Sequence, residues 1–514
     1  MAQTRPNVLL LFSDEHSHRF LGSCRKNGEN AYTPNLDMLA ASATTFSDAY
    51  CQMPLCTPSR ISMLTGKEAR NSGAWGNSRV LRPELNTIPR HLANNGYETC
   101  LVGKMHLGGK LQMSGFNHRP YGDLTGNCGH QWEPIYDIAH AQAMRTRTTH
   151  TGQTDIPESL LQDKVVATET VSWVREHSAA SPEQPWFVCC GFSRPHFPLT
   201  APKRWIDYYA KRGISEPMFE KQGDAVGHPM TEGMRDGFKC EEIDHNEMME
   251  ARLGYFACVS YLDEVIGDLL NTLEREGKLD NTIVIYATDH GEMAGEHGLW
   301  WKNGWFEACT RVPLIISTPE SRAAGKPVMC TTPVALLDLF PTICDLTGID
   351  TPDDLQGRNL TPALSGNMME DIPIYCDSLV PRWGKGTEFR SVRYKQYKYI
   401  RFRDAEPLFF DLDNDPGETD NLLIKGIPCE AESALELMRD FANNSVDFDK
   451  AEEEMLVRDG NLSHEYKLEL DVDLNKTKGT FWNAYILPDG RMVCADEVIY
   501  APVVLLEDAE KILE

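Results

Sequence analysis

The chain has 514 residues and a net charge of −26, from 50 lysines and arginines against 76 aspartates and glutamates. This length suits one large domain with a smaller second one, or two domains of similar size. The acidic balance argues against nucleic acid or an acidic membrane surface as the main partner. The 15 cysteines are an odd number without a repeated spacing, which does not fit a disulfide framework.

The first residues of the sequence lead directly into an apolar run, with no basic segment, long apolar core or small-residue cleavage site. No stretch reaches the ~20 apolar residues that span a bilayer. Together with the unpatterned cysteines, these features lead us to expect a cytoplasmic protein with reduced thiols and no membrane partner. A chain trimmed of a signal peptide would begin in the same way.

Short apolar runs alternate with amphipathic segments over the first two thirds of the chain. Runs without polar alternation predict buried central strands of a parallel sheet at 7–13, 186–192 and 281–288, with a further strand at 97–102. Capped or amphipathic segments predict helices at 87–95, 160–176, 246–277 and 333–348. The pattern predicts an α/β fold with a large, mostly parallel central sheet flanked by helices.

The pattern changes near residue 371 to short alternating segments, at 389–393, 397–403 and 408–412, with a helix near 431–443. It predicts a smaller antiparallel sheet plus a helix. We therefore expect a catalytic domain at 1–370 and a smaller C-terminal α+β domain at 371–514, with an acidic tail from 447. The segments 116–154 and 214–244 have little periodicity, and we interpret them as loops over the site.

Potential metal ligands follow two of the predicted strands. Asp14 and Glu15 come after the first strand, and Asp289 and His290 come after 281–288. Residues at the carboxyl ends of strands lie where α/β sheets bind their ligands. Taken alone, the first of these strand ends is better explained by an aspartate that only caps the next segment. Two such strand ends could share one divalent cation, bound by carboxylate oxygens and one imidazole.

A cysteine, a proline and an arginine stand at the spacing C-x-P-x-R in Cys56, Pro58 and Arg60. Pro58 suits the first turn of a helix, and one turn would carry the Arg60 guanidinium back over Cys56. A nucleophile at a helix N-terminus beside a fixed cation suits an anionic substrate. The alternative is an inert buried cysteine with a surface arginine.

Further basic side chains occur in short motifs. Lys104 and His106 are two residues apart, so in an extended segment they would project from one face and suit an anion and a proton transfer. Two prolines flank His196 and hold it in an extended segment. Taken singly, each motif fits an exposed lysine or a structural histidine equally well.

Six motifs together resemble the formylglycine-dependent sulfatases of the alkaline phosphatase superfamily. They stand in the family's order over about residues 5–425: T-P-N-L-D-M-L-A at 33–40, C-T-P-S-R with L-T-G at 56–66, G-K-M-H-L-G at 103–108, R-P-H-F-P at 194–198, E-H-G-L-W-W-K at 296–302 and R-V-P-L-I at 311–315. The resemblance implies a sulfatase, a sulfuric ester hydrolase that releases an alcohol and inorganic sulfate. It also implies that a formylglycine-generating enzyme oxidises Cys56 to 3-oxoalanine (formylglycine), whose hydrate is the nucleophile.

The resemblance also implies the site residues. One divalent cation would be bound by Asp14, Glu15, Cys56 after its conversion, Asp289 and His290. Calcium is the first choice, manganese is left open by the imidazole, and magnesium is third. The catalytic residues would be Cys56, Arg60, Lys104, His106, His196 and Lys302, and the substrate would contact Asn77, Lys104, His196 and Lys302.

Two other functions stay open on the sequence. A phosphonate monoester or phosphodiester hydrolase would use the same aldehyde, because sulfate and phosphate are both tetrahedral anions. A sulfatase-like binder without turnover would leave Cys56 unmodified. The substrate of a sulfatase would be a small-molecule or saccharide sulfate ester, and the chain could form a homo-oligomer.

Overall fold

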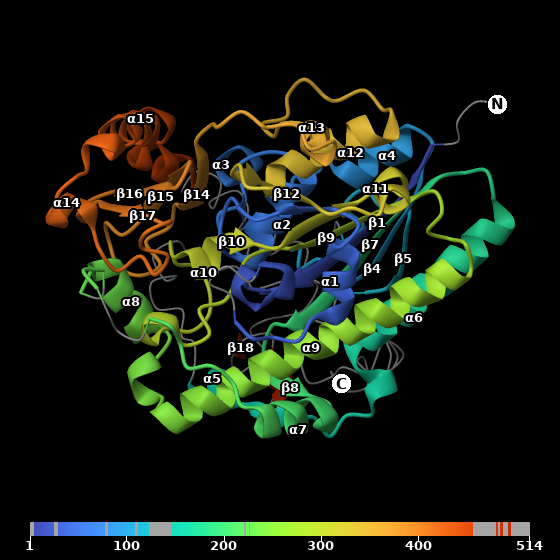
Figure 1. The fold of residues 1–514 in the computed structure, drawn as a ribbon, viewed down its shortest axis with the longest axis horizontal. Coiled ribbons are helices and arrows are strands. Elements are labelled where there is room, and N and C mark those ends of the chain that lie inside the picture. The colour runs from blue at the N-terminus through green and yellow to red at the C-terminus, as the bar shows by residue number, and fades with distance from the viewer. Residues whose placement is uncertain are drawn as a thin grey trace.

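The computed structural model describes residues 5–24, 29–77, 81–107, 112–122, 145–219, 223–225, 227–455, 480–481, 484–486 and 492–494. Within these ranges the main sheet has eight strands in the order β12-β2-β11-β9-β1-β7-β4-β5 (Figure 1). The strands are β1 (Asn7–Asp14), β2 (Thr44–Phe46), β4 (Glu98–Gly103), β5 (His118–Tyr121), β7 (Trp186–Pro195), β9 (Thr282–Thr288), β11 (Leu314–Ser317) and β12 (Val328–Cys330).

The middle of this sheet is parallel. β1 lies between β7 and β9 and runs parallel to both, and β4 runs parallel to β7. β11 is antiparallel to β9 and to β2. Because β1, β4, β7 and β9 point the same way, their carboxyl ends meet at one edge of the sheet, where α/β proteins bind ligands.

Helices cover both faces of the sheet, so alternate residues of β1 enter different cores. Leu9 and Leu11 belong to the core on one side, and Val8, Leu10 and Phe12 to the core on the other. The first core is covered by α1 (Pro34–Ala40), α6 (Gln162–Ala180) and the long α9 (His245–Arg275), and the second by α2 (Cys56–Thr65), α4 (Ile88–Asn94) and α12 (Leu339–Thr347).

A second, antiparallel sheet follows in the chain, in the order β14-β15-β16-β17. It lies at one end of the molecule with a long helix, α15, packed on it (Figure 1). The elements are β14 (Ile374–Ser378), β15 (Phe389–Tyr394), β16 (Tyr397–Phe402), β17 (Leu408–Asp411) and α15 (Cys429–Ser445). The predicted fold class is therefore confirmed: a mostly parallel sheet between helices, then a smaller antiparallel sheet with a helix.

Short elements complete the described chain. None of its helices is both long and apolar enough to cross a bilayer. The remaining strands are β3 (Ala49–Tyr50), β6 (Thr151–Gln153), β8 (Leu199–Ala201), β10 (Arg311–Val312), β13 (Val334–Ala335), β18 (Thr480–Phe481), β19 (Ala484–Ile486) and β20 (Met492–Cys494). The remaining helices are α3 (Ala69–Ser72), α5 (Arg145–Thr149), α7 (Lys203–Arg212), α8 (Pro229–Gly237), α10 (Glu307–Thr310), α11 (Pro319–Ala324), α13 (Thr361–Leu364) and α14 (Leu422–Lys425).

Two regions differ from the sequence expectations. The helix expected at 333–348 begins only at Leu339, because residues 334–335 pair with β3 as a short strand. The loop expected at 214–244 contains α8, which starts at Pro229 and is capped by the His228 side chain, an acceptor for the Met230 N–H. Most of the loop expected at 116–154 (residues 123–144) and most of the acidic tail lie outside the described residues.

A buried ionic network joins the second sheet to the first part of the chain. Lys398 of β16 donates to Glu307 Oε1 at 2.9 Å and to Glu418 Oε1 at 2.7 Å. The Glu307 carboxylate also accepts from the Tyr50 hydroxyl at 2.8 Å, and Tyr50 accepts from Arg393 Nε at 2.8 Å. These ion pairs cross the predicted boundary at residue 370, which itself stays a prediction.

Replacing Lys398 with methionine is expected to lower the free energy of unfolding by about 3–5 kcal/mol, because two carboxylates would stay buried without their cation. Denaturant titration measures this loss. Lys164→Met is the matched control, since Lys164 is a partly exposed lysine that pairs with Asp268 at 2.6 Å. Its loss should be below about 1 kcal/mol. Equal losses in the two variants would contradict the stabilising role of the network.

Candidate active site and metal centre

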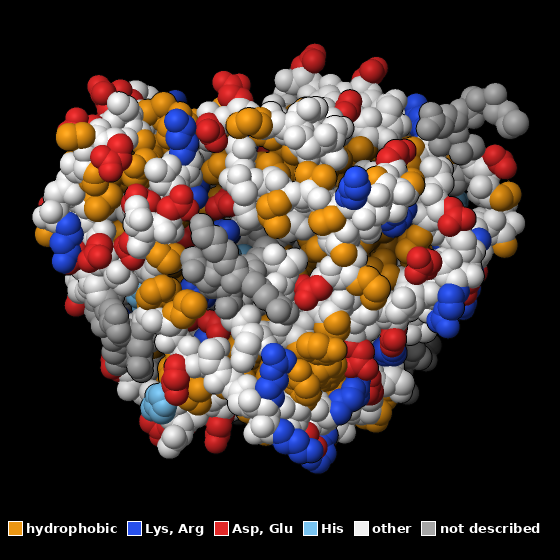
Figure 2. Space-filling model, in the orientation of Figure 1, with side chains coloured by type: hydrophobic (Ala, Val, Ile, Leu, Met, Phe, Trp, Pro, Cys, Tyr) orange, Lys and Arg blue, Asp and Glu red, His pale blue; other side chains and the backbone are white. Residues whose placement is uncertain are grey.

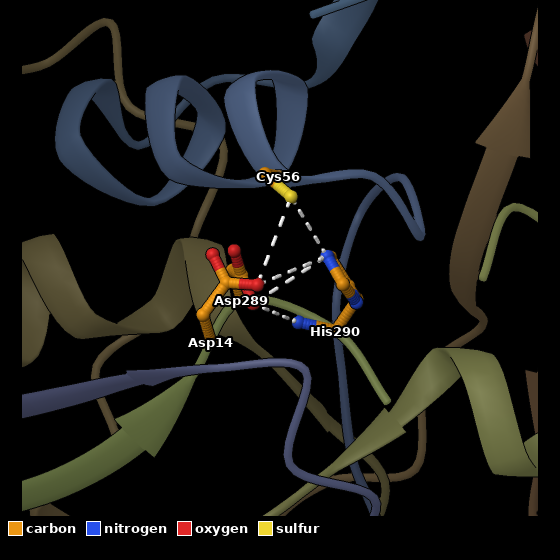
Figure 3. Close-up of side chains that lie close together, drawn as sticks. All are labelled: Asp14, Cys56, Asp289 and His290. Carbon is orange, nitrogen blue, oxygen red and sulfur yellow. Dashed lines mark hydrogen bonds and ion pairs between the residues drawn. The ribbon is translucent and has the colours of Figure 1, made fainter. Parts of the chain in front are cut away.

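The edge of the main sheet at the carboxyl ends of β1 and β9 carries the expected metal ligands. Asp14 is the last residue of β1, and Asp289 and His290 follow β9 directly. The two strands pair in parallel and in register, so the residues after them emerge side by side. Cys56 is the first residue of α2, and its sulfur points toward the same place (Figure 3).

Four side chains meet there closely enough to hold one cation. One ligand atom from each of Asp14, Cys56, Asp289 and His290 lies within 4.8 Å of all the others. Cys56 Sγ is 3.2 Å from His290 Nε2 and 3.8 Å from Asp14 Oδ1. All four residues are buried. Two carboxylates and an imidazole are a donor set that divalent cations accept, so these residues fit the expected metal.

A backbone contact sets the proton on His290. Its Nδ1 lies 2.9 Å from the Gly291 carbonyl oxygen, to which it donates. The lone pair of Nε2 is then directed at Cys56 and the two aspartates. This is the tautomer that a metal ligand needs.

Arg60 lies fully buried behind the two aspartates, one turn after Cys56 in α2. Its Nε donates to Asp289 Oδ2 and its Nη2 to Asp14 Oδ2, each at 2.8 Å. Burial acts to raise the pKa of Asp14, but the surrounding cations, Lys104 foremost, outweigh it and hold that pKa well below its usual range. The guanidinium fork thus holds both carboxylates in place with charge-assisted hydrogen bonds.

Lys104 and His106 follow β4, which ends at Gly103. A Cβ atom on Gly103 would lie 2.4 Å from the Gly191 carbonyl oxygen, so only glycine allows β4 and β7 to approach so closely there. Lys104 Nζ is 3.2 Å from Asp14 Oδ2. The backbone at His106 is left-handed, with φ of 55°, so the extended segment expected for this pair is not formed. Burial, with Lys104 adding to it, lowers the pKa of His106 well below its usual value.

Asn77 caps the helix that carries Cys56. Its Oδ1 accepts the Thr57 N–H at 3.0 Å. The Thr57 hydroxyl donates to the His106 carbonyl at 2.6 Å. The expected substrate residue Asn77 therefore lies beside Cys56 and holds the N-terminus of α2.

Glu15, His196 and Lys302 gather on the other side of Asp14. Lys302 Nζ donates to Glu15 Oε2 at 2.9 Å. His196 Nε2 lies 3.5 Å from Glu15 Oε2 and 3.9 Å from Asp14 Oδ1. Asp14, Glu15 and His196 form a second group at metal-ligand spacing, but the Lys104 and Lys302 ammonium groups lie against it. Their positive charges would oppose a second cation.

One charged residue of this site had no role in the sequence interpretation. Glu292 is buried, and its Oε1 accepts the Ala294 N–H at 2.8 Å and the Trp301 N–H at 2.5 Å. It follows Asp289 and His290 in the same D-H-G-E run. The D-H-G-E run could have indicated that Glu292 lies near the metal ligands. The sequence does not show in which direction its side chain points.

The unmodified thiol is a weak nucleophile in this environment. Burial raises the pKa of Cys56 well above its ordinary value, and Asp14 adds to the rise. Without a metal, the group therefore stays protonated at neutral pH, and a thiol attacks far more slowly than a thiolate.

Comparison with known proteins places the chain. Residues 6–349 match the family model described as Sulfatase, and residues 295–440 match the one described as N-sulphoglucosamine sulphohydrolase, C-terminal.

The chain belongs to the sulfatase family.

The sulfatase is 29% identical over 439 residues to a choline-sulfatase of Rhizobium meliloti (strain 1021), covering 82% of this chain and 83% of the relative. Two solved structures share its fold. One is an enzyme in complex with its substrate D-glucosamine-2-N,6-O-disulfate, with a TM-score of 0.67 and 22% identity over 87% of this chain and 98% of the other. The second is the phosphonate monoester hydrolase of Agrobacterium radiobacter, with a TM-score of 0.68 and 20% identity. The match covers 95% of this chain and 99% of the other.

Removing the metal from the loaded sulfatase with a chelator should lower its melting temperature. A cation present at 100 times its dissociation constant stabilises the folded state by about 2.7 kcal/mol, and Asp14 and Asp289 lose a shared partner without it. Thermal melts before and after chelation, then with Ca²⁺, Mn²⁺ or Mg²⁺ restored, measure the effect. Asp14→Asn should abolish the shift, and a wild-type melt that none of the three ions moves would contradict the metal site.

Proposed function

We propose that this sulfatase hydrolyses a sulfate ester to an alcohol and inorganic sulfate, through a formylglycine hydrate made from Cys56. One observation carries the proposal. Cys56 begins a buried helix at the meeting point of Asp14, Asp289 and His290, with the cation of Arg60 directly behind. A nucleophile among metal ligands and fixed cations suits attack on a tetrahedral anion.

The charges buried at the site suit such an ester. With a divalent cation bound, the site would carry one net positive charge, or two if Glu15 and Glu292 share a proton. This matches a singly charged ester and its doubly charged sulfate product. On the face drawn in Figure 2, acidic and basic side chains are interspersed. The net charge is the sum of the cation, the four carboxylates and the three basic side chains. These side chains are Asp14, Glu15, Asp289, Glu292, Arg60, Lys104 and Lys302.

The divalent cation and the formylglycine made from Cys56 would have separate tasks. The cation would polarise the reacting oxygens. Formylglycine would supply a hydrate with two hydroxyl groups, one to attack sulfur and one to release the sulfate afterwards.

The chain's own residues would bind the substrate and move the protons. We assign the sulfate oxygens to Lys104, His196 and Lys302. Burial lowers the pKa of Lys302, but the surrounding negative groups outweigh it and raise that pKa, so this lysine is protonated at neutral pH. It is the proposed donor of a proton to the leaving alcohol. Burial and nearby cations lower the pKa of His196, which keeps its ring neutral before substrate binds. Its Nδ1 donates to the Phe197 carbonyl oxygen at 2.9 Å, so Nε2 must take up a proton to donate to a sulfate oxygen. His106, neutral for the same reasons, accepts the proton of the second hydroxyl.

The main alternative keeps the site and changes the substrate. A phosphonate monoester or a phosphodiester is also a singly charged tetrahedral anion, and the fold is similar to that of the phosphonate monoester hydrolase. A binder without turnover would have no need of a proton-accepting His106 beside the Lys104 and Lys302 cations, which makes it the weaker alternative.

Other parts of the proposal rest on less specific observations. Calcium is the proposed cation, with manganese and magnesium as alternatives. The solved relative that binds a disulfated glucosamine supports a saccharide sulfate as one substrate class, beside a small-molecule ester. Twelve of the 15 cysteines are described as free thiols, which supports a reducing, cytoplasmic location.

The deciding experiment produces the protein together with a formylglycine-generating enzyme and measures the mass of the peptide that contains Cys56. Conversion of CH₂SH to CHO would lower the mass by about 18 Da. The converted protein is then assayed on an aryl sulfate and an aryl phosphonate monoester side by side. Faster sulfate release supports the proposal, faster phosphonate hydrolysis supports the alternative, and turnover of neither by converted, metal-loaded protein would reject both.

A further inference from the structure

The segment that carries Lys302 has an unusual backbone. Trp301 and Asn303, on either side of the lysine, both adopt left-handed conformations, with φ of 76° and 69°. Non-glycine residues rarely do so, and such strain persists only where the surroundings hold it. The Asn303 N–H donates to the carbonyl of Pro54 at 2.8 Å, two residues before Cys56. The Lys302 segment is thus tied to the segment that carries the nucleophile.

Glu292 holds the other end of this segment. Its Oε1 accepts the Trp301 N–H at 2.5 Å and the Ala294 N–H at 2.8 Å. The Met293 N–H in turn donates to the Trp301 carbonyl at 2.9 Å. The carboxylate and the backbone beside it therefore fix the peptide unit just before Lys302.

Glu15 holds the tip of the same lysine. Its Oε2 accepts from Lys302 Nζ at 2.9 Å, and both side chains are buried. The Glu15 backbone is itself left-handed, with φ of 66°, and is pinned on both sides: its N–H donates to Asp289 Oδ1 at 3.1 Å, and its carbonyl accepts from the Tyr255 hydroxyl at 2.6 Å. These two hydrogen bonds hold the strained backbone of Glu15, which directs its carboxylate at Lys302.

We propose that Glu15 and Glu292 are positioning residues that together fix the ammonium group of Lys302 for catalysis, with Glu292 setting the backbone and Glu15 the side chain. A lysine has a flexible four-carbon stem and a compact charge, so it reaches one place reproducibly only if its partners fix it. Glu15 would then act through Lys302 and not as a ligand of the cation. This inference rests on the proposed function.

The site geometry favours this role for Glu15. The four side chains that converge on one point are Asp14, Cys56, Asp289 and His290, and Glu15 is not among them. Its carboxylate lies with Lys302 and His196 instead. Losing a partner that orients a reactive group typically lowers activity 10–100-fold and leaves the group itself in place.

A double-mutant cycle tests the inference on the converted, calcium-loaded protein. Glu15→Gln is expected to lower kcat/KM for an alkyl sulfate about 10–100-fold. Its effect on a nitrophenyl sulfate should be smaller, because that leaving group needs little help from Lys302. Adding Glu15→Gln to Lys302→Met should cost nothing further, since Glu15 would act only through the lysine. Additive losses in the double variant would overturn the proposal.

The calcium content of the variants shows whether Glu15 positions Lys302 or binds the metal. This measurement does not require an active enzyme. Glu15→Gln should retain as much calcium as wild type by elemental analysis, whereas Asp14→Asn should lose it. Loss of calcium in Glu15→Gln would overturn the inference even if the sulfatase reaction is established. Conversely, inactive wild type would reject the proposed function while this measurement still decides the role of Glu15.

Two further variants complete the test: Glu292→Ala removes the second positioning residue, and Glu29→Gln controls for a general loss of stability. Glu292→Ala removes the acceptor of the Trp301 N–H and should show the same preference for good leaving groups and the same lack of additivity with Lys302→Met. Glu29→Gln is the matched control, because Glu29 is a buried carboxylate held by Arg252 at 2.7 Å and makes no contact with Lys302. Its kcat/KM should equal that of wild type. A Glu292→Ala enzyme with unchanged kinetics would contradict the proposal.

Discussion

Replacing Cys56 with alanine is expected to lower kcat/KM for a sulfate ester about 10⁶-fold, the size of effect seen when a hydrolase loses its nucleophile. Asp14, Asp289 and His290 would stay in place, because Arg60 and backbone groups hold them without the cysteine. The variant should therefore fold and retain its metal. Steady-state kinetics and elemental analysis on the same samples measure both outcomes.

The serine variant of Cys56 makes the expectation sharper. A serine offers one hydroxyl group, which can attack sulfur but has no second hydroxyl to release the sulfate. We expect at most one alcohol released per protein molecule and a peptide heavier by about 80 Da, the mass of a retained SO₃ group. Cys258→Ala is the control, since Cys258 is a buried thiol in α9 whose sulfur contacts the Thr200 carbonyl oxygen, and it should leave kcat/KM unchanged. Sustained turnover by the serine variant would contradict the need for an aldehyde hydrate.

Replacing Arg60 with methionine is expected to lower the free energy of unfolding of the metal-free protein by about 3–5 kcal/mol. The guanidinium is fully buried and donates to Asp14 and Asp289 at 2.8 Å. Without it, two adjacent buried carboxylates repel each other with less compensating charge, since of the close cations that the structure describes only Lys104, 3.2 Å from Asp14 Oδ2, remains. A divalent cation would restore part of that compensation, so the melting temperature of the variant should respond to metal more strongly than that of wild type.

Arg390→Met is the matched control for this prediction. Arg390 is also buried and pairs with Asp377 at 2.6 Å, in the second sheet. Its removal should destabilise the protein by a similar amount without changing the response to metal. Thermal melts of wild type and both variants, with and without calcium, separate the two effects. An Arg60→Met protein whose metal response equals that of Arg390→Met would show that Arg60 does not act on the metal ligands.

The framework of the fold and the metal ligands could be predicted from the sequence because both depend on local patterns. β1 and β9 are continuous apolar runs, and Asp14, Asp289 and His290 are read directly from their ends. Parallel pairing then brings strand ends together whatever the loops do. The prediction that Cys56 begins a helix was right for the same reason, since Pro58 marks the first turn.

The orientation of individual side chains could not be predicted in this way. Glu15 was expected among the metal ligands, a prediction still untested, but its left-handed backbone turns the carboxylate to Lys302. This backbone is held by Asp289 and Tyr255, each more than 200 residues away in the sequence. A local sequence pattern cannot show such contacts. Likewise, Asn77 was expected to contact substrate, and only the packing shows its oxygen on the N-terminus of α2.

The burial of Cys56 sets an order of events during synthesis. Its sulfur is covered in part by His290, which follows it by 234 residues in the chain. At 5–20 residues per second, a ribosome needs roughly ten to fifty seconds to reach that histidine. Until then β9 is missing and the sheet cannot close over the cysteine. If Cys56 is converted as proposed, the modifying enzyme would have this interval to reach it, because the folded protein leaves the cysteine only 1% exposed.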